Sequence, residues 1–236
     1  MKLTLLIVFL ILSLALPVYY IFVNKQEGML ISIIAGIGIY LSTTIIMNLL
    51  GNMLQFSGVS ILEDKKYYVA LVSLVLTLSV MIFTNFKNLC QNKSAATLVF
   101  CGFGLVNFFI YNMNSYMNIL YIGMNNSIEK LTAIYPIEIA QSLLEYYEKI
   151  STVDLFLLIA ELILSFYILK NLFILVFKKD NKIFDHLFFM IFVFIYYNIQ
   201  YYVTNTMVAF FLYNLILLVL IYIGRVKNGK QKAENN

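Results

Sequence analysis

The chain has 236 residues, of which 62% are hydrophobic and only 12% are charged, and its formal net charge is +4. Charged residues are too few to form the solvated surface of a soluble domain of this length. The composition therefore excludes a soluble domain and predicts an integral membrane protein. The positive charges are spread over connections and a C-terminal tail instead of one basic face, so we expect no nucleic-acid partner.

Seven apolar stretches predict transmembrane helices, because a helix of about 20 apolar residues crosses the roughly 30 Å of hydrocarbon in a bilayer. The first stretch follows Met1 and Lys2, where a secretory signal peptide would lie. It is too long for the apolar part of a signal peptide and has no cleavage site of small residues, so we interpret it as a span. The predicted spans, all in one transmembrane domain over residues 1–224, are residues 3–23, 29–50, 68–86, 95–111, 154–176, 183–202 and 207–223.

Between the fourth and fifth spans, residues 112–152 are too rich in Asn, Glu and Lys to cross a membrane. Pro136 suits the first turn of a helix over about residues 136–150. Apolar residues recur along one face of this helix and acidic residues along the other. We expect an extracytoplasmic amphipathic helix, and its acidic face favours contact with the protein's own spans over contact with anionic lipid heads.

The distribution of basic residues predicts the orientation, because they gather in cytoplasmic segments. With a cytoplasmic C-terminus, the outer segments hold five of them, Lys2, Lys65, Lys66, Lys130 and Lys149. The inner segments hold ten, Lys25, Lys87, Lys93, Lys178, Lys179, Lys182, Arg225, Lys227, Lys230 and Lys232. We therefore expect the N-terminus outside and a basic, disordered cytoplasmic tail over residues 225–236.

The residue usage also indicates a source and a membrane. Arg225 is the only arginine among the 16 basic residues, and Ile, Asn, Phe and Tyr are abundant, as in proteins of AT-rich bacterial genomes. This favours a bacterial cytoplasmic membrane. Tryptophan is absent, so tyrosines should form the aromatic belt at the membrane surfaces, and candidates near span ends are Tyr19, Tyr20, Tyr67, Tyr68, Tyr201 and Tyr202.

Glu161 is the first candidate functional residue, because a carboxylate inside a span is costly unless it is paired, protonated or exposed to a polar cavity. Asp154 lies two helical turns earlier on the same face, which predicts a polar stripe entering from outside. Lys170 lies roughly 13.5 Å further along the axis on the opposite face, so it cannot pair with Glu161. We expect Lys170 to extend to the membrane surface.

No residues suggest a catalytic or metal site, so we expect no cofactor and no metal. His186, the only histidine, lies beside Asp185 at the cytoplasmic end of the sixth span, whereas a zinc hydrolase normally gathers three ligands. Cys90 and Cys101 fit neither a disulfide framework nor a CxxC metal pair. The chain also contains no nucleophile elbow, P-loop or HExxH motif.

The fourth span contains the sequence GFGLVN, from Gly102 to Asn107. Gly102 and Gly104 are not a dinucleotide fingerprint, because the third glycine is missing and no strand precedes them. In a membrane helix, small residues let a neighbouring backbone approach, and Asn107 could hydrogen-bond across the contact. The simplest interpretation of this segment is therefore that it packs against a neighbouring helix.

Together with Glu161 in the sequence LIAEL, the segment GFGLVN resembles a motif set of the YhfC-type family. These bacterial membrane proteins are related to the PrsW and CAAX-protease-like intramembrane metalloproteases. The resemblance covers most of the chain, from the first span to the last. In that family, paired glutamates, a Gly-His-Gly-Gly-x-Glu motif, a Gly-x-Glu-Arg motif and a later His with a following Asp are thought to supply metal ligands and a general base.

The motifs are degenerate in this chain. Phe103 and Asn107 stand where the glycine-rich motif has its histidine and glutamate, and Leu162 stands where an arginine should follow Glu161. The paired-glutamate position near residues 82–88 and the last motif within residues 196–202 contain none of the expected acids or histidines. The resemblance therefore implies a relative without catalytic activity, since Phe and Asn cannot replace a zinc ligand or a general base.

Three functions follow as hypotheses. The first is an inactive protease relative that serves as a binding or regulatory scaffold for a membrane protein or hydrophobic peptide, for example in immunity or as a subunit of a transport complex. Its polar intramembrane site would contain Glu161, Asn107 and Asn198. The second is a transporter of a small molecule, or a transporter subunit, that uses Glu161. The third is a divergent active membrane peptidase, and the scarcity of acids and histidines in the spans argues against it.

Overall fold

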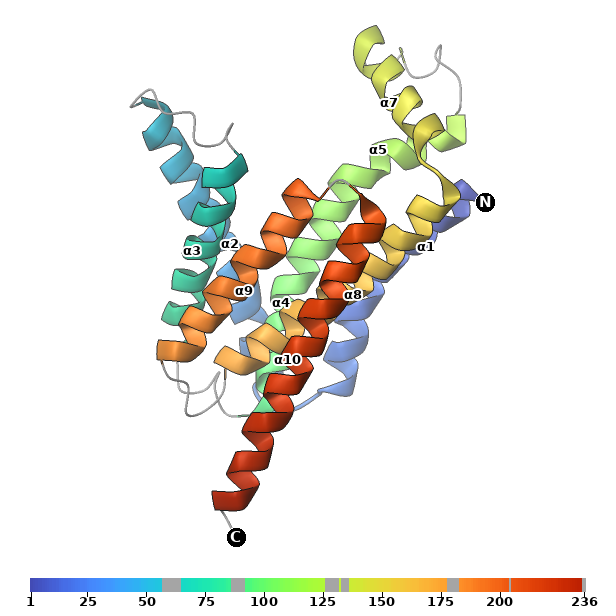
Figure 1. The fold of residues 1–236 in the computed structure, drawn as a ribbon. Coiled ribbons are helices and arrows are strands. Elements are labelled where there is room, and N and C mark those ends of the chain that lie inside the picture. The colour runs from blue at the N-terminus through green and yellow to red at the C-terminus, as the bar shows by residue number, and fades with distance from the viewer. Residues whose placement is uncertain are drawn as a thin grey trace.

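The structure is a computed structural model, and it describes residues 1–56, 65–85, 92–125, 132, 136–177, 183–203 and 205–234. Every regular element within these ranges is a helix (Figure 1), which confirms the predicted all-helical class for them. The elements are α1 (Lys2–Val23), α2 (Met29–Phe56), α3 (Lys65–Thr84), α4 (Lys93–Gly104), the π-helix η2 (Leu105–Ile110), α5 (Tyr111–Asn125), α7 (Ile137–Lys149), α8 (Thr152–Val176), α9 (Ile183–Tyr202) and α10 (Thr206–Glu234).

Six helices within the described residues are long and apolar enough to cross a membrane, namely α1, α2, α3, α8, α9 and α10. This is the composition of a membrane-embedded protein. The fourth predicted span, residues 95–111, lies in a helical run, but the apolar part of that run, Lys93–Phe108, is shorter than the other six. Six apolar helices are therefore found where seven spans were predicted. Residue 86, at the predicted end of the third span, lies outside the described residues.

The polar connection predicted to begin at residue 112 is instead helical as far as Asn125. Ile119 and Ile122 of α5 are buried. Ile119 packs in a cluster with Leu5, Leu6 and Leu155, which belong to α1 and α8. A segment too polar to face lipid can still be helical when one face packs on neighbouring helices, and this is the reason for the difference.

The helix α7 packs on the protein itself, at the end of α5 (Figure 1). Ala140 of α7 is buried against Ile122 of α5. A methyl group at Gly123 of α5 would meet the ring of Tyr147, so the two helices touch closely there. The Lys2 ammonium donates to the backbone carbonyls of Tyr147 and Glu148, at 3.3 and 3.1 Å. These bonds join the start of α1 to the C-terminal end of α7. A cation is favourable at the C-terminal end of a helix.

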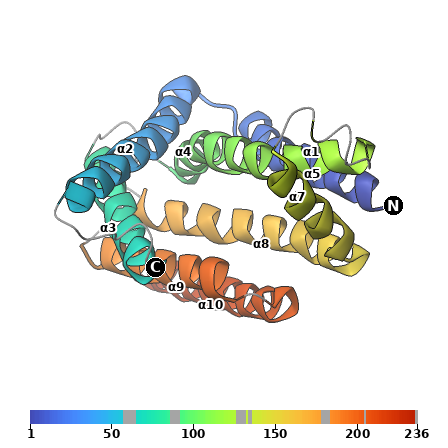
Figure 2. The ribbon, with the colours of Figure 1, turned by 90° about the horizontal axis from the view of Figure 1, so that it is seen from above.

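Viewed from above, α8 runs through the middle of the molecule (Figure 2). The pair α9 and α10 lies on one side of α8, and α1, α4 and α5 lie on the other. At one end, α2 packs on α4 while α3 packs on both α2 and α9, so these two helices connect the sides. The interior of the bundle is thus bounded by α2, α3, α4, α8 and α9.

The core between α4 and α8 is a cluster of phenylalanines. The ring of Phe100 on α4 lies edge-on to Phe166 of α8, with 4.8 Å between centroids, and 5.5 Å from the ring of Phe173. Phe173 is in turn 5.2 Å from Phe103 of α4 and 5.7 Å from Phe189 of α9. Edge-on contacts, such as those of Phe100 with Phe166 and of Phe173 with Phe189, stabilise a pair of rings beyond their buried area. They fix α8 against α4 and α9.

The C-terminal tail, predicted to be disordered, continues the helix α10 as far as Glu234. Residues 225–234 contain no proline and include Lys, Gln, Ala and Glu, which have high helix propensity. Local propensity therefore extends the span beyond its apolar part.

A capping box begins α8. The Ser151 hydroxyl accepts a bond from the Asp154 amide at 3.0 Å, and the Asp154 carboxylate accepts one from the Ser151 amide at 3.0 Å. We expect Ser151→Ala to lower the free energy of unfolding by about 0.5–2 kcal/mol. The melting temperature of the detergent-purified protein measures this change. Ser142→Ala on α7 is the control, because its hydroxyl only bonds the Ile139 carbonyl of its own helix. Equal melting temperatures for both variants would contradict the prediction.

Candidate functional site

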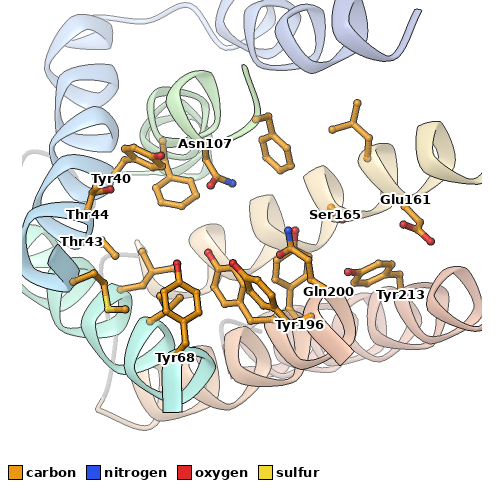
Figure 3. Close-up of a pocket in the computed structure, with 18 of the residues that line it drawn as sticks. Tyr40, Thr43, Thr44, Tyr68, Asn107, Glu161, Ser165, Tyr196, Gln200 and Tyr213 are labelled. Atoms are coloured by element: carbon orange, nitrogen blue, oxygen red, sulfur yellow. The ribbon is translucent and has the colours of Figure 1, made fainter. Parts of the chain in front are cut away.

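A cavity of about 450 Å³ lies inside the bundle. Side chains from α2, α3, η2, α8 and α9 line most of it, with single contributions from α1, α4, α5 and α10. Figure 3 shows Tyr40, Thr43 and Thr44 of α2 at one end of this cavity and Glu161 of α8 with Tyr213 of α10 at the other. Its volume falls in the range of pockets that bind small molecules, about 300–1,000 Å³.

Two close backbone contacts position one wall of the cavity. A methyl group at Gly102 of α4 would meet the carbonyl oxygen of Ile33, and one at Gly36 of α2 would meet the carbonyl oxygen of Val99. The two helices therefore cross with their backbones in contact, as the packing interpretation of Gly102 predicts. Gly104 differs, because a methyl group there would find only ordinary contacts at 3.5 Å or more.

Directly after this crossing, the helix widens into the π-helix η2, which contains Asn107. Insertions of this kind in α-helices frequently lie at functional sites. The Asn107 side chain lines the cavity. No hydrogen bond joins this side chain to another residue that the structure describes, so its amide is available to a ligand. The bond across the glycine contact that the packing interpretation would allow is not formed.

Among the described residues that line the cavity, Glu161 is the only acidic one and none is Lys, Arg or His. Its Oε1 atom is buried and has no hydrogen-bond partner in the described part of the chain. Ser165, one turn further along α8, lines the cavity beside it. The site therefore holds one carboxylate that the protein leaves unpaired.

Tyrosines dominate the rest of the lining. Tyr196 and Tyr213 lie with their ring centroids 5.6 Å apart, and Tyr68 and Tyr201 with theirs 5.5 Å apart. Of the residues that the structure describes, seven tyrosines line the cavity, namely Tyr40, Tyr68, Tyr116, Tyr196, Tyr197, Tyr201 and Tyr213. Tyr68 and Tyr201, which were expected in the interfacial belt from their positions near span ends, both line the cavity. The site thus combines aromatic faces with hydroxyl groups around a single acid.

The structure brings two of the three predicted polar site residues to one cavity. Asn107 and Glu161 both line it, from η2 and α8. Asn198 is not among the lining residues, and its amide donates to the Phe194 carbonyl of its own helix at 2.8 Å. Gln200, two residues later on α9, lines the cavity. Sequence reasoning missed this residue because helix α9 carries polar and tyrosine side chains on several faces.

Lys170, which was expected to extend to the membrane surface, contacts two tyrosines of α1 and α8. Its ammonium group donates to the Tyr20 hydroxyl at 3.1 Å and lies 4.2 Å from the centroid of the Tyr20 ring and 4.4 Å from that of Tyr167. The Tyr20 hydroxyl also donates to that of Tyr167 at 3.1 Å. The chain thus holds a half-buried ammonium group between α1 and α8 by two aromatic faces.

Asp154 belongs to the capping box of α8, and its other oxygen accepts a bond from the Thr206 hydroxyl at 3.3 Å. It also lines a second cavity of about 540 Å³ at the N-terminal end of α8. Tyr116 and Leu158 line both cavities, so the second adjoins the first. We call this second cavity the vestibule. The two residues of the predicted polar stripe therefore line different cavities, Asp154 the vestibule and Glu161 the inner cavity.

Within the described residues, no three His, Cys, Asp or Glu side chains are grouped as a metal ion would need. His186 and Asp185 are buried at the start of α9, and Cys101 is buried in α4, whereas Cys90 lies outside the described residues. No known protein family matches the chain, and neither a curated protein nor a solved structure is significantly similar to it.

We expect Glu161→Gln to stabilise the empty protein. The substitution replaces a carboxyl group whose buried oxygen has no partner in the described part of the chain and which, when it is ionised, leaves an unpaired charge. Leaving such a group unsatisfied costs about 1–3 kcal/mol or more. A gain of about 1 kcal/mol corresponds to roughly 2–4 °C in melting temperature for a chain of this size. Glu138→Gln, at an exposed position of α7, should leave the melting temperature unchanged. A lower melting temperature for Glu161→Gln would show that the carboxylate stabilises the folded protein.

Proposed function

We propose that the chain crosses the bacterial cytoplasmic membrane seven times, with the N-terminus outside and the C-terminus in the cytoplasm. Six apolar helices and a further helical run from Lys93 to Asn125 support this number. Figure 1 draws the two termini at opposite ends of the molecule, as an odd number of crossings requires. The excess of basic residues in the segments assigned to the inside supports the orientation.

We propose that this protein binds a partner of the membrane, such as a hydrophobic peptide or another amphiphilic molecule, in the cavity around Glu161. The observation that carries this proposal is an interior cavity with one unpaired carboxylate and seven tyrosines. A purely structural interior would be filled to the density of organic crystals, and its polar groups would be paired. Ligand pockets instead keep a few unpaired polar groups among aromatic walls.

We propose further that the chain is an inactive relative of the YhfC-type proteases. Phe103, in place of the motif histidine, lines the cavity and packs on Phe173 and Tyr40, with centroids 5.2 and 5.9 Å away. Neither this ring nor the Asn107 amide can act as a general base. Elemental mass spectrometry after incubation with zinc tests the proposal. Stoichiometric zinc in the wild type that is lost in Glu161→Gln would contradict it.

Photo-crosslinking from within the cavity tests the binding function. The crosslinking amino acid benzoylphenylalanine would replace Tyr40 in the cavity or, as a control, Phe211, whose side chain is 65% exposed on the outside of α10. We expect a discrete adduct that is not a lipid at position 40 and only lipid adducts at position 211. Lipid adducts alone at both positions would contradict the binding function.

Transport is the second candidate, and the vestibule that adjoins the cavity favours it. A carboxylate within a spanning helix is typical of ion and substrate pathways. In this case the ligand of the cavity would cross the membrane, and Glu161→Gln would abolish its uptake or export by whole cells. Unchanged movement of the ligand that is crosslinked at position 40 would leave binding as the function.

A further inference from the structure

We propose that the cavity binds an organic cation with an aromatic or apolar body, and that this cation and a proton occupy Glu161 in turn. The inference rests on the proposed binding function and adds the chemical class of the ligand. It follows from the charges that face Glu161, the walls of the cavity, its size and its vestibule.

The charge balance of the cavity calls for a cation. The other titratable groups among the described lining residues are tyrosine hydroxyls. The neighbouring elements contribute Tyr213 of α10, Tyr196 of α9, Tyr68 of α3, Tyr40 of α2 and Tyr116 of α5. From α1 and η2, the rings of Phe9 and Phe108 line the cavity, and neither side chain is titratable. Whether Glu161 is protonated or ionised, an anion would find no positive group among the described lining residues, so its charge would stay uncompensated at low dielectric.

The aromatic walls select an organic cation over a metal ion. A tyrosine ring attracts a cation that lies within about 6 Å of its centroid, and recognition of quaternary ammonium groups commonly uses cages of such rings. The chain already holds the Lys170 ammonium in this way, 4.2 and 4.4 Å from two ring centroids. Divalent metal ions need several charged or strongly polar ligands, whereas the cavity offers one carboxylate.

The size and position of the cavity fit this class of ligand. A volume of about 450 Å³ would be mostly empty around a bare ion but accommodates a body of several rings. Asp154 lines the vestibule. Lys149 also lines it, and its Nζ atom forms an ion pair with Oε2 of Glu145 at 3.2 Å. A cation that enters from this side therefore meets one carboxylate at the mouth and a second, Glu161, two turns further along α8.

The exchange is balanced in charge and atoms. In the empty state the carboxyl group of Glu161 carries a proton, and when the cation binds, the proton leaves to solvent and the carboxylate pairs with the cation. One bound cation replaces one proton, so the cavity stays neutral in both states. By linkage, the affinity for a permanent cation rises up to tenfold per pH unit on the acidic side of this titration and levels off above it.

Equilibrium binding to the detergent-purified full chain tests the inference. The probes are two permanent cations, tetraphenylphosphonium and ethidium, and the anion tetraphenylborate, which has nearly the shape of the first. We expect the wild type to bind at least one cation, more tightly as the pH rises from 5.5, and to bind the anion at least a hundredfold more weakly. Glu161→Gln should weaken the binding of that cation at least a hundredfold and remove its pH dependence, whereas Glu161→Asp should retain both in part. Glu138→Gln on α7 should bind as the wild type does.

The inference is overturned if neither cation binds, if tetraphenylborate binds equally well, or if Glu161→Gln binds the cations unchanged. Size-exclusion chromatography and melting temperature verify that each variant is folded. If the photo-crosslinking experiment gives a discrete adduct at position 40 and any of these results is also obtained, the binding function is retained and a cationic ligand is rejected. Lipid adducts alone would reject the binding function itself.

Discussion

Replacing Gly102 by alanine should strongly destabilise the protein. The new methyl would meet the backbone carbonyl oxygen of Ile33, and a backbone cannot rotate away as a side chain can. Overpacking of a core typically costs about 1–3 kcal/mol, and a contact with backbone should reach the upper end. We expect the melting temperature to fall by about 6–12 °C and α2 to separate from α4.

Gly104→Ala is the matched control, because it adds the same methyl group two residues away. At this position the nearest atoms are side-chain carbons of Phe108, Pro17 and Phe100 at 3.5, 3.7 and 3.8 Å. The gain in helix propensity, about 1 kcal/mol, should balance or exceed any cost there. If both variants melted together, the helices α2 and α4 would not cross with their backbones in contact.

Phe100→Ala should cost about 3–5 kcal/mol, since it leaves a void among the rings that join α4 to α8. Phe100 is fully buried, and its ring lies near those of Phe108, Phe166 and Phe173. In a bilayer, close packing replaces the hydrophobic effect as the force between helices, so the lost contacts themselves carry the penalty. The melting temperature in detergent and the yield of folded protein from membranes measure the effect.

Phe211→Ala provides the comparison for this loss. Its ring is on the outside of α10, where lipid or detergent can fill the space that the substitution leaves. We expect a change within about 0.5 kcal/mol. A loss at Phe211 as large as that at Phe100 would place the dominant packing on the outer surface of α10 instead of between α4 and α8.

The positions of the long apolar helices could be predicted from the sequence. The predicted sixth span, residues 183–202, has the bounds of α9, and the predicted fifth span begins two residues after the start of α8. Apolar length alone decides such segments, because a bilayer requires a continuous run of about 20 residues. A carboxylate within α8 was also visible, since Glu161 interrupts that run.

The sequence could not predict the features that depend on neighbouring helices. The start of α5 is polar, and it is helical because α5 packs on α1 and α7. The tyrosines Tyr68 and Tyr201 lie near span ends, yet they face the interior because α3 packs on α9. Likewise, the choice of Gln200 over Asn198 for the cavity depends on the rotation of α9, which no local pattern determines.

These differences change the picture of the site more than that of the fold. Glu161 was expected among amides, with Asn107 and Asn198 as its neighbours, which suits hydrogen-bonding to a peptide. The structure surrounds the cavity with tyrosine rings and leaves the carboxylate without a partner. Aromatic faces around one acid favour a ligand with a positive charge and a large apolar surface.

The access of charged reagents to the cavity tests this account most directly. A single cysteine at Ser165, which lines the cavity one turn beyond Glu161, would replace the two native cysteines, Cys90 and Cys101, as the only thiol. Two methanethiosulfonates would be compared on it, one with a trimethylammonium group and one with a sulfonate group. The rates would be corrected for the reaction of each reagent with a free thiol.

We predict that the cationic reagent modifies this cysteine at least tenfold faster than the anionic one, and that Glu161→Gln removes the preference. Equal rates for the two reagents with Glu161 intact, or no reaction with either of them, would contradict a cavity that admits cations to Glu161.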